Sequence, residues 1–234
     1  MCFEWSNYYM KTYRLGGYAS ILTGLSYLFI AVTFFLLPPE QRAGQVLSGP
    51  FFISVAENAL FLKIQLLLFA LNAILAIAVV QALSKWMNNH KMIQWSSTLA
   101  VIGYAILIYI NFYAFEQIPR LAEAYIRLDF PLRTIITAFG IGFDDWMAFI
   151  LTGLWMFVIN WYGLLEHKFP KTLAILGMFG GLCNFLIAAG SVLKSSFMMM
   201  AAAGLGGVMI GPVWFIWTGK ILLHEKEVTI EKQL

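Results

Sequence analysis

Long apolar runs, separated by short polar stretches, set the pattern of this chain of 234 residues. Six runs reach the length of about 20 residues with which an α-helix crosses the hydrocarbon core of a bilayer. They are continuous and lack the alternation of period two that marks membrane β-strands, so the pattern predicts helices. We therefore expect an all-α fold, a polytopic membrane helical bundle that forms one domain over residues 1–234. Its transmembrane helices are predicted at residues 15–37, 60–83, 93–115, 146–165, 173–193 and 197–223.

The connecting segments are longest on one side of the predicted bundle. Residues 38–59 are expected to form a loop, and Pro119–Leu128 is expected to form a short outer-surface helix. The charged residues from Arg120 to Arg127 are spaced for mutual pairing on that helix. The spacing fits either a solvated helix face or, together with Arg133, a cluster of arginines that receives an anion.

The region before the fourth span is too long for a single crossing. One helix from Pro131 to Leu165 would be about 52 Å long, against a hydrocarbon core of about 30 Å. The glycines within residues 140–142 mark the predicted break, which places Asp144 and Asp145 at the start of the fourth span. A carboxylate at that position can cap free N–H groups and complement the helix dipole.

The two aspartates are the only charged side chains between Thr134 and Leu165. An aspartate at the bilayer centre costs about 2.5–3.5 kcal/mol, so both are expected at a membrane surface or facing the protein interior. Adjacent residues on a helix diverge by about 100°, so only one of the two can point inward. Asp145 shares its helix face with Thr152 and Asn160 and is therefore the functional candidate, whereas Asp144 is expected to be the cap or a solvent-facing residue.

Polar residues recur every seven positions in several spans, which places them on one helix face. The second, third and fifth spans show this spacing at Asn58, Gln65 and Asn72, at Ser97, Tyr104 and Asn111, and at Gly177, Asn184 and Ser191. These stripes are expected to face the bundle interior. They fit either hydrogen bonds that hold the helices together or a polar cavity that opens outward.

Basic residues indicate the orientation of the bundle. With six spans both termini lie on one side, and nine of the 15 Lys and Arg residues fall on that side. This bias predicts a multi-pass protein of the cell inner membrane with both termini cytoplasmic. Charged residues make up only 12% of the chain and form no basic run, so the lipid bilayer is an expected partner and nucleic acid is not.

Small residues and a proline mark the last two spans. Gly177 and Gly181, and likewise Gly207 and Gly211, have the spacing that allows helices to approach closely. The pattern predicts packing of these two spans on each other or, alternatively, contact with another membrane protein or a second copy of the chain. Pro212 removes a backbone hydrogen bond and predicts a kink in the last span.

Signatures of catalysis and of metal binding are missing. The chain contains no GxSxG, HExxH, phosphate-binding loop or dinucleotide fingerprint. His90, His167 and His224 lie at the ends of spans without the spacing of a helical ligand pair, and Met198–Met200 are expected to serve apolar packing. No catalytic residue, metal or cofactor is therefore predicted.

Four short motifs stand out in the second half of the chain: Asp145-Trp146, the turn at residues 167–171, the glycine-rich fifth span and the closing stretch at residues 214–220. Together they resemble a family of uncharacterised six-span bacterial integral membrane proteins, known as a domain of unknown function. The resemblance implies a bacterial inner-membrane bundle and no specific activity. The chain departs from that family in carrying Asp144 where a basic residue often precedes the Asp-Trp pair.

Three functional hypotheses follow. The leading one is a polar cavity, open to the outside, that binds or transports a small molecule or lipid. The second is a non-catalytic subunit or assembly factor, and the third is an intramembrane enzyme with Asp145 as general acid or base. The candidate ligand-binding or proton-relay residues are Asp145, Asp144, Glu57, Arg133, Lys194, Asn72, Asn111, Thr152, Asn160 and Asn184.

Overall fold

The structure of the protein, a computed structural model, describes residues 2–42, 48–87, 90–127 and 145–231. These residues form helices and short connections and contain no β-strand. The expected all-α bundle is confirmed, since six helices are long and apolar enough to cross a membrane. They cover Thr12–Leu36, Leu60–Trp86, Lys91–Arg127, Trp146–Leu165, Lys171–Val192 and Ser196–His224, in agreement with the predicted spans to within a few residues except at the end of the third.

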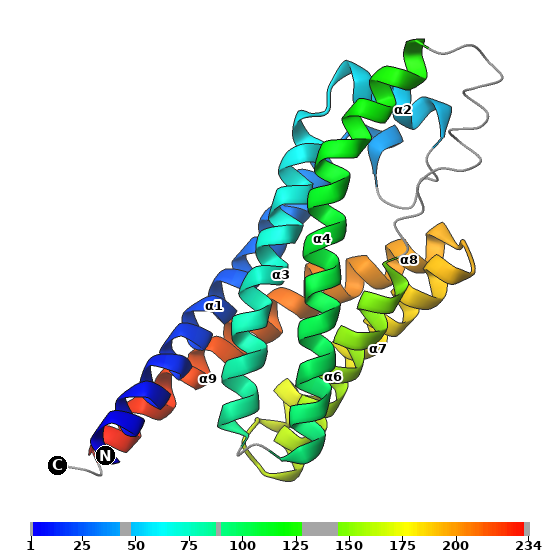
Figure 1. Ribbon diagram of the computed structural model, residues 1–234. Coiled ribbons are helices and arrows are strands. Elements are labelled where there is room, and N and C mark those ends of the chain that lie inside the picture. The colour runs from blue at the N-terminus through cyan, green and yellow to red at the C-terminus, as the bar shows by residue number, and fades with distance from the viewer. Residues whose placement is uncertain (1, 43–47, 88–89, 128–144, 232–234) are drawn as a thin grey trace.

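The spans pack in an order that follows the chain and then closes on itself. Consecutive spans lie side by side, and the last span returns to pack along the first (Figure 1). Both ends of the chain therefore lie at one end of the bundle, which we call the terminal end, and the opposite end is the loop end. The spanning elements are α1 (Cys2–Leu36), α3 (Leu60–Trp86), α4 (Lys91–Arg127), α6 (Trp146–Leu165), α7 (Lys171–Val192), and then α8 (Ser196–Ala203), η2 (Gly204–Ile210) and α9 (Gly211–Glu231).

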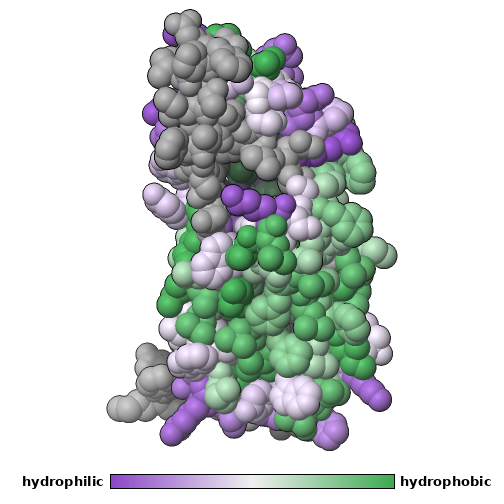
Figure 2. Space-filling model, turned by 90° about the vertical axis from the view of Figure 1, so that its right-hand side faces the viewer, coloured by the Kyte–Doolittle hydropathy of each residue, from purple (hydrophilic) through white to green (hydrophobic). Residues whose placement is uncertain are grey.

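The surface of the bundle carries a broad apolar belt between two polar ends (Figure 2). Large apolar side chains such as Phe29, Phe35 and Phe197 point outward and are more than half exposed. The interior contains small residues that let the helices approach, together with a few fully buried large side chains such as Trp155 and Trp214. A surface this apolar indicates contact with the bilayer.

Helix α4 is longer than the sequence predicts. It continues without a break to Arg127, so the separate surface helix expected at Pro119–Leu128 is wrong. Burial explains the continuity, because Ala122 is fully buried and the ring of Tyr125 stacks on Phe52 at 5.1 Å. Packing of this last part of α4 outweighs the backbone hydrogen bond that the proline removes.

The helix that packs against the end of α4 is α2 (Gly49–Glu57), within the segment that we expected to be a loop. Ser48 caps this helix, since its hydroxyl oxygen accepts a hydrogen bond from the N–H of Phe51. Gln41, in the 3₁₀ turn η1 (Pro39–Gln41), donates to Ser54 Oγ and to the carbonyl of Asn58 at 3.0 and 2.9 Å. The loop end therefore has a small hydrophobic core of its own.

The irregularity predicted at Pro212 takes the form of a π-helix. The seven residues of η2 separate α8 from α9 and end at Ile210, two residues before this proline. Because Pro212 has no N–H, the preceding turn cannot complete its α-helical hydrogen bonds. Gly206, Gly207 and Gly211 leave room for the rearranged turn beside Cys183 of α7 and Tyr27 of α1.

The glycines of the fifth span pack against a different helix from the one predicted. A Cβ atom at Gly177 would overlap the carboxamide of Asn160, and one at Gly181 would meet the backbone of α6. The fifth span therefore uses these glycines against the fourth span. The fifth and last spans do pack on each other, but through Gly180 and Gly206.

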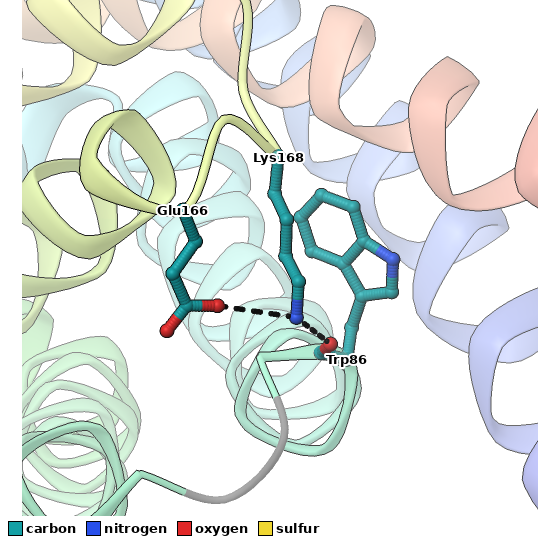
Figure 3. A network of polar contacts seen from close by, with 3 residues as sticks. All are labelled: Trp86, Glu166 and Lys168. Carbon is teal, nitrogen blue, oxygen red and sulfur yellow. Dashed lines mark hydrogen bonds and ion pairs between the residues drawn. The ribbon is translucent and has the colours of Figure 1, made fainter.

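A charged contact fixes the turn between α6 and α7 at the terminal end (Figure 3). Lys168 Nζ donates to the carbonyl oxygen of Trp86 at 2.8 Å and lies 3.3 Å from a carboxylate oxygen of Glu166. The ammonium group also lies 5.6 Å from the centre of the Trp86 ring. Lysine thus complements the C-terminal carbonyls of α3, and it ties the turn to that helix.

Candidate functional site

A central cavity of about 390 Å³ lies between the spans. Every spanning helix contributes to its lining, from Tyr27 on α1 to Phe215 on α9. This volume is within the range of small-molecule sites, which is about 300–1,000 Å³. The cavity is the place where the predicted polar stripes meet.

The polar side of the cavity comes from the middle four spans. Carboxamides and one carboxylate project there from α3, α4, α6 and α7. The residues are Gln65, Asn72, Asn111, Asp145 and Asn184. Spacing by seven along α3 brings two of them to the same wall, as the sequence predicts.

Two of the carboxamides are fixed by hydrogen bonds to the protein. Asn72 Nδ2 donates to Ser26 Oγ at 2.7 Å and to the carbonyl of Thr23 at 3.4 Å, which links α3 to α1. Asn111 Nδ2 donates to the carbonyl of Leu107 at 2.7 Å on its own helix. A carbonyl only accepts, so these bonds define which amide atom is the nitrogen and leave both Oδ1 atoms without a hydrogen bond.

The other two carboxamides have no such partners. Within the described part of the chain, the side chains of Gln65 and Asn184 make no hydrogen bond. Gln65 is nevertheless a buried residue, at 6% exposure. Neither carboxamide is among the fully buried polar groups that lack a partner, since both line the cavity and Asn184 is only half-buried. Their amide groups are therefore open to the cavity.

The opposite side of the cavity is apolar. Apart from the tyrosine of α1, it consists of aliphatic and aromatic side chains and of glycines that expose backbone. The residues come from α1, α8, η2 and α9 and include Ile30, Phe34, Met199, Met200, Ala203, Gly204, Gly207 and Val208. The polar side chains of the cavity thus come from α3, α4, α6 and α7, where they alternate with apolar residues, and a bound molecule would contact mainly apolar groups on α1, α8, η2 and α9.

Aromatic side chains close the bundle below the cavity, towards the terminal end. Tyr104 lines the cavity and lies edge-on to Trp155, which packs in the same manner on Trp214. Phe169 then packs on both Trp214 and Trp86. Trp214 is fixed further by a hydrogen bond of 2.8 Å from its Nε1 to Asn160 Oδ1.

The structure brings four of the ten predicted candidate residues together in the cavity: Asn72, Asn111, Asp145 and Asn184. Asp145, and not Asp144 as we predicted, occupies the N-cap position of α6, and the Asp145 side chain makes no capping hydrogen bond. Because the cavity reaches this position, Asp145 is the one carboxylate of its described lining.

The other candidates lie elsewhere. Thr152 bonds to the carbonyl of Ala148 on its own helix, and Asn160 lies below the cavity, bonded to Trp214. Glu57 and Lys194 are exposed at helix ends of the loop end, where Lys194 adopts φ 53° beyond the last turn of α7. Asp144 and Arg133 lie outside the described residues.

The sequence reasoning missed Tyr27 and the apolar wall. Tyr27 stacks on Phe215 at 5.8 Å and packs against Gly207 of η2 and Gly211 of α9. Ser20, Thr23 and Tyr27 share one face of the first span, and this spacing was the available signal. The π-helix has no comparable signal, because its glycines also fit an ordinary packing motif.

Comparison with protein families, with curated proteins and with solved structures gives no match for this chain. Of the family resemblance noted in the sequence, only the six-span architecture is therefore supported. In the described parts of the chain, no three His, Cys, Asp or Glu side chains gather as metal ligands would. The cavity remains the feature on which a functional argument can be built.

Proposed function

We propose that this membrane protein binds a small molecule or lipid in the central cavity. The observation that carries the proposal is the pair of carboxamides at Gln65 and Asn184, which line the cavity without a hydrogen bond to the described protein. Buried polar groups are normally satisfied, so unpaired amides facing an open volume are characteristic of groups that bind a ligand.

The alternative role, hydrogen bonding between helices, applies to only some of the polar residues. Asn72 links α3 to α1 and Asn160 links α6 to α9, so both hold spans together. Gln65 and Asn184 have no such contact in the described chain. Packing between spans therefore accounts for the first pair and leaves the second pair for a ligand.

Aromatic packing at the terminal end of the cavity favours binding of a ligand over its free passage through the bundle. The aromatic side chains from Tyr104 to Trp86 fill the bundle between the cavity and the terminal end. A ligand would thus enter from the loop end or from the bilayer, and transport across the membrane would require these aromatic side chains to move apart. We place the terminal end in the cytoplasm of a bacterial inner membrane, on the basis of its excess of Lys and Arg.

Filling the cavity tests the proposal. A Cβ atom at Gly204 meets no other atom within 4 Å, although this residue lines the cavity, so Gly204→Leu adds volume to the cavity without a clash at Cβ. We expect molecules that co-purify with the protein in nanodiscs, measured by native mass spectrometry, to decrease at least about tenfold in occupancy.

The matched control is Leu205→Phe, which adds volume one residue away at a side chain that is 48% exposed and does not line the cavity. This variant should retain the co-purified molecules. Equal occupancy in wild type, Gly204→Leu and Leu205→Phe, with all three folded by circular dichroism, would contradict the proposal.

A further inference from the structure

We infer that the ligand is an amphiphile drawn from the bilayer, with a head group that donates hydrogen bonds, such as a hydroxyl or an ammonium group. This inference rests on the proposed function and specifies its ligand class. Three observations carry it: the kind of polar atoms that the cavity offers, the absence of cations from its described lining, and the continuity of its apolar wall with the lipid-facing surface.

The available polar atoms of the cavity are mainly acceptors. Asn72 and Asn111 use their Nδ2 groups within the protein, so each offers Oδ1 to the cavity. Gln65 and Asn184 offer both a donor and an acceptor. A head group that donates therefore finds more partners than one that only accepts.

The second observation concerns the cations near the cavity. The described lining contains neither lysine nor arginine, and the nearby cations of the loop end have other contacts. Arg42 donates to the carbonyls of Leu37 and Phe35 at the end of α1, and Lys63 lies over the ring of Phe115 on α4. An anionic head group would thus find no cation in the described lining, which is unfavourable in a medium of low dielectric constant.

The apolar wall extends to the outer surface. Met200 of α8 and Val208 of η2 line the cavity and are also 46% and 42% exposed. Helix α8 packs on α7 and η2 but not closely on α1, although both helices line the cavity. An alkyl chain can therefore lie between the apolar residues of α1 and α8, with its head group at the carboxamides.

Photocrosslinking of the protein in nanodiscs tests this ligand class. We would compare three C16 probes that carry the same chain diazirine and end in a hydroxyl, an ammonium or a sulfonate group, and map the crosslinks by mass spectrometry. The alcohol and the amine should label α8 and η2 about fivefold or more above the sulfonate. Excess hexadecanol should compete, whereas glycerol and ethanolamine should not.

The outcomes of this experiment distinguish a wrong ligand class from a wrong binding site. Equal or stronger labelling by the sulfonate would overturn the donor head group, and competition by glycerol or ethanolamine as strong as that by hexadecanol would overturn the bilayer as the source. If no probe labels wild type above Gly204→Leu at these positions, and Gly204→Leu also retains the co-purified molecules, the binding site itself is refuted.

Discussion

Replacing Gly177 by alanine is expected to destabilise the bundle by about 1–3 kcal/mol or more. The added Cβ would overlap the carboxamide of Asn160, which cannot easily move because its Nδ2 donates to the carbonyl of Met156 and its Oδ1 accepts from Trp214. Relief of the overlap requires separation of α6 and α7 or loss of these hydrogen bonds. Unfolding in mixed detergent, followed by circular dichroism, measures the effect.

Gly204→Ala is the matched control, since its Cβ meets open space. Glycine within a helix is less stable than alanine by about 0.5–1 kcal/mol, so this variant should unfold at the same or a slightly higher denaturant fraction. Equal stability of the Gly177 and Gly204 variants would show that α6 and α7 do not pack as described.

Replacing both Gln65 and Asn184 by leucine is expected to raise stability and to abolish ligand binding. Each change removes a carboxamide that makes no hydrogen bond within the described chain, so no contact within the protein is lost, and it places a more apolar side chain in the interior of the bundle. The same change removes groups that we assign to the ligand. Stability is measured after detergent washing has removed bound molecules, and binding is measured in nanodiscs by native mass spectrometry.

Asn72→Leu should have the opposite effect on stability. It removes the hydrogen bonds from α3 to Ser26 and Thr23 of α1, and such bonds between membrane helices contribute about 0.6 kcal/mol on average and up to about 1.7. If the Gln65 and Asn184 variant lost stability as Asn72→Leu does, these residues would be structural contacts and the ligand assignment would be wrong.

Periodicity predicts this fold well because lipid imposes a simple rule on the sequence. A spanning segment must satisfy its backbone hydrogen bonds internally, so a run such as residues 146–165 has only one solution, and its predicted bounds coincide with those of α6. Spacing by seven also predicts correctly that Asn72, Asn111 and Asn184 reach a common interior space.

The differences arise where packing outweighs local signals. A proline normally ends a helix, yet α4 continues through Pro119 because Ala122 and Tyr125 become buried beneath α2. The sequence cannot show this, since α2 lies more than 60 residues away along the chain. Which helix packs against a glycine face also depends on the tertiary structure. The sequence pattern predicts the last span as the partner of Gly177, whereas the structure places Asn160 of α6 against it.

The candidate site, too, is only partly predictable from the sequence. Spacing identifies which side chains face inward, but it does not separate those that bond to the protein from those that face open volume. Asn160 and Asn184 belong to similar stripes, yet Asn160 bonds to Trp214 and Asn184 lines the cavity. The η2 part of the apolar wall has no sequence signal beyond Pro212 and its glycines.

An experimental structure of the protein in nanodiscs tests the central claim most directly. We predict non-protein density in the central cavity, with its polar end within hydrogen-bond distance of the carboxamides of Gln65 or Asn184 and its apolar part against Met199 and Met200. A filled and dry interior, in which these carboxamides bond to other protein groups and no density remains between the spans, would contradict the account.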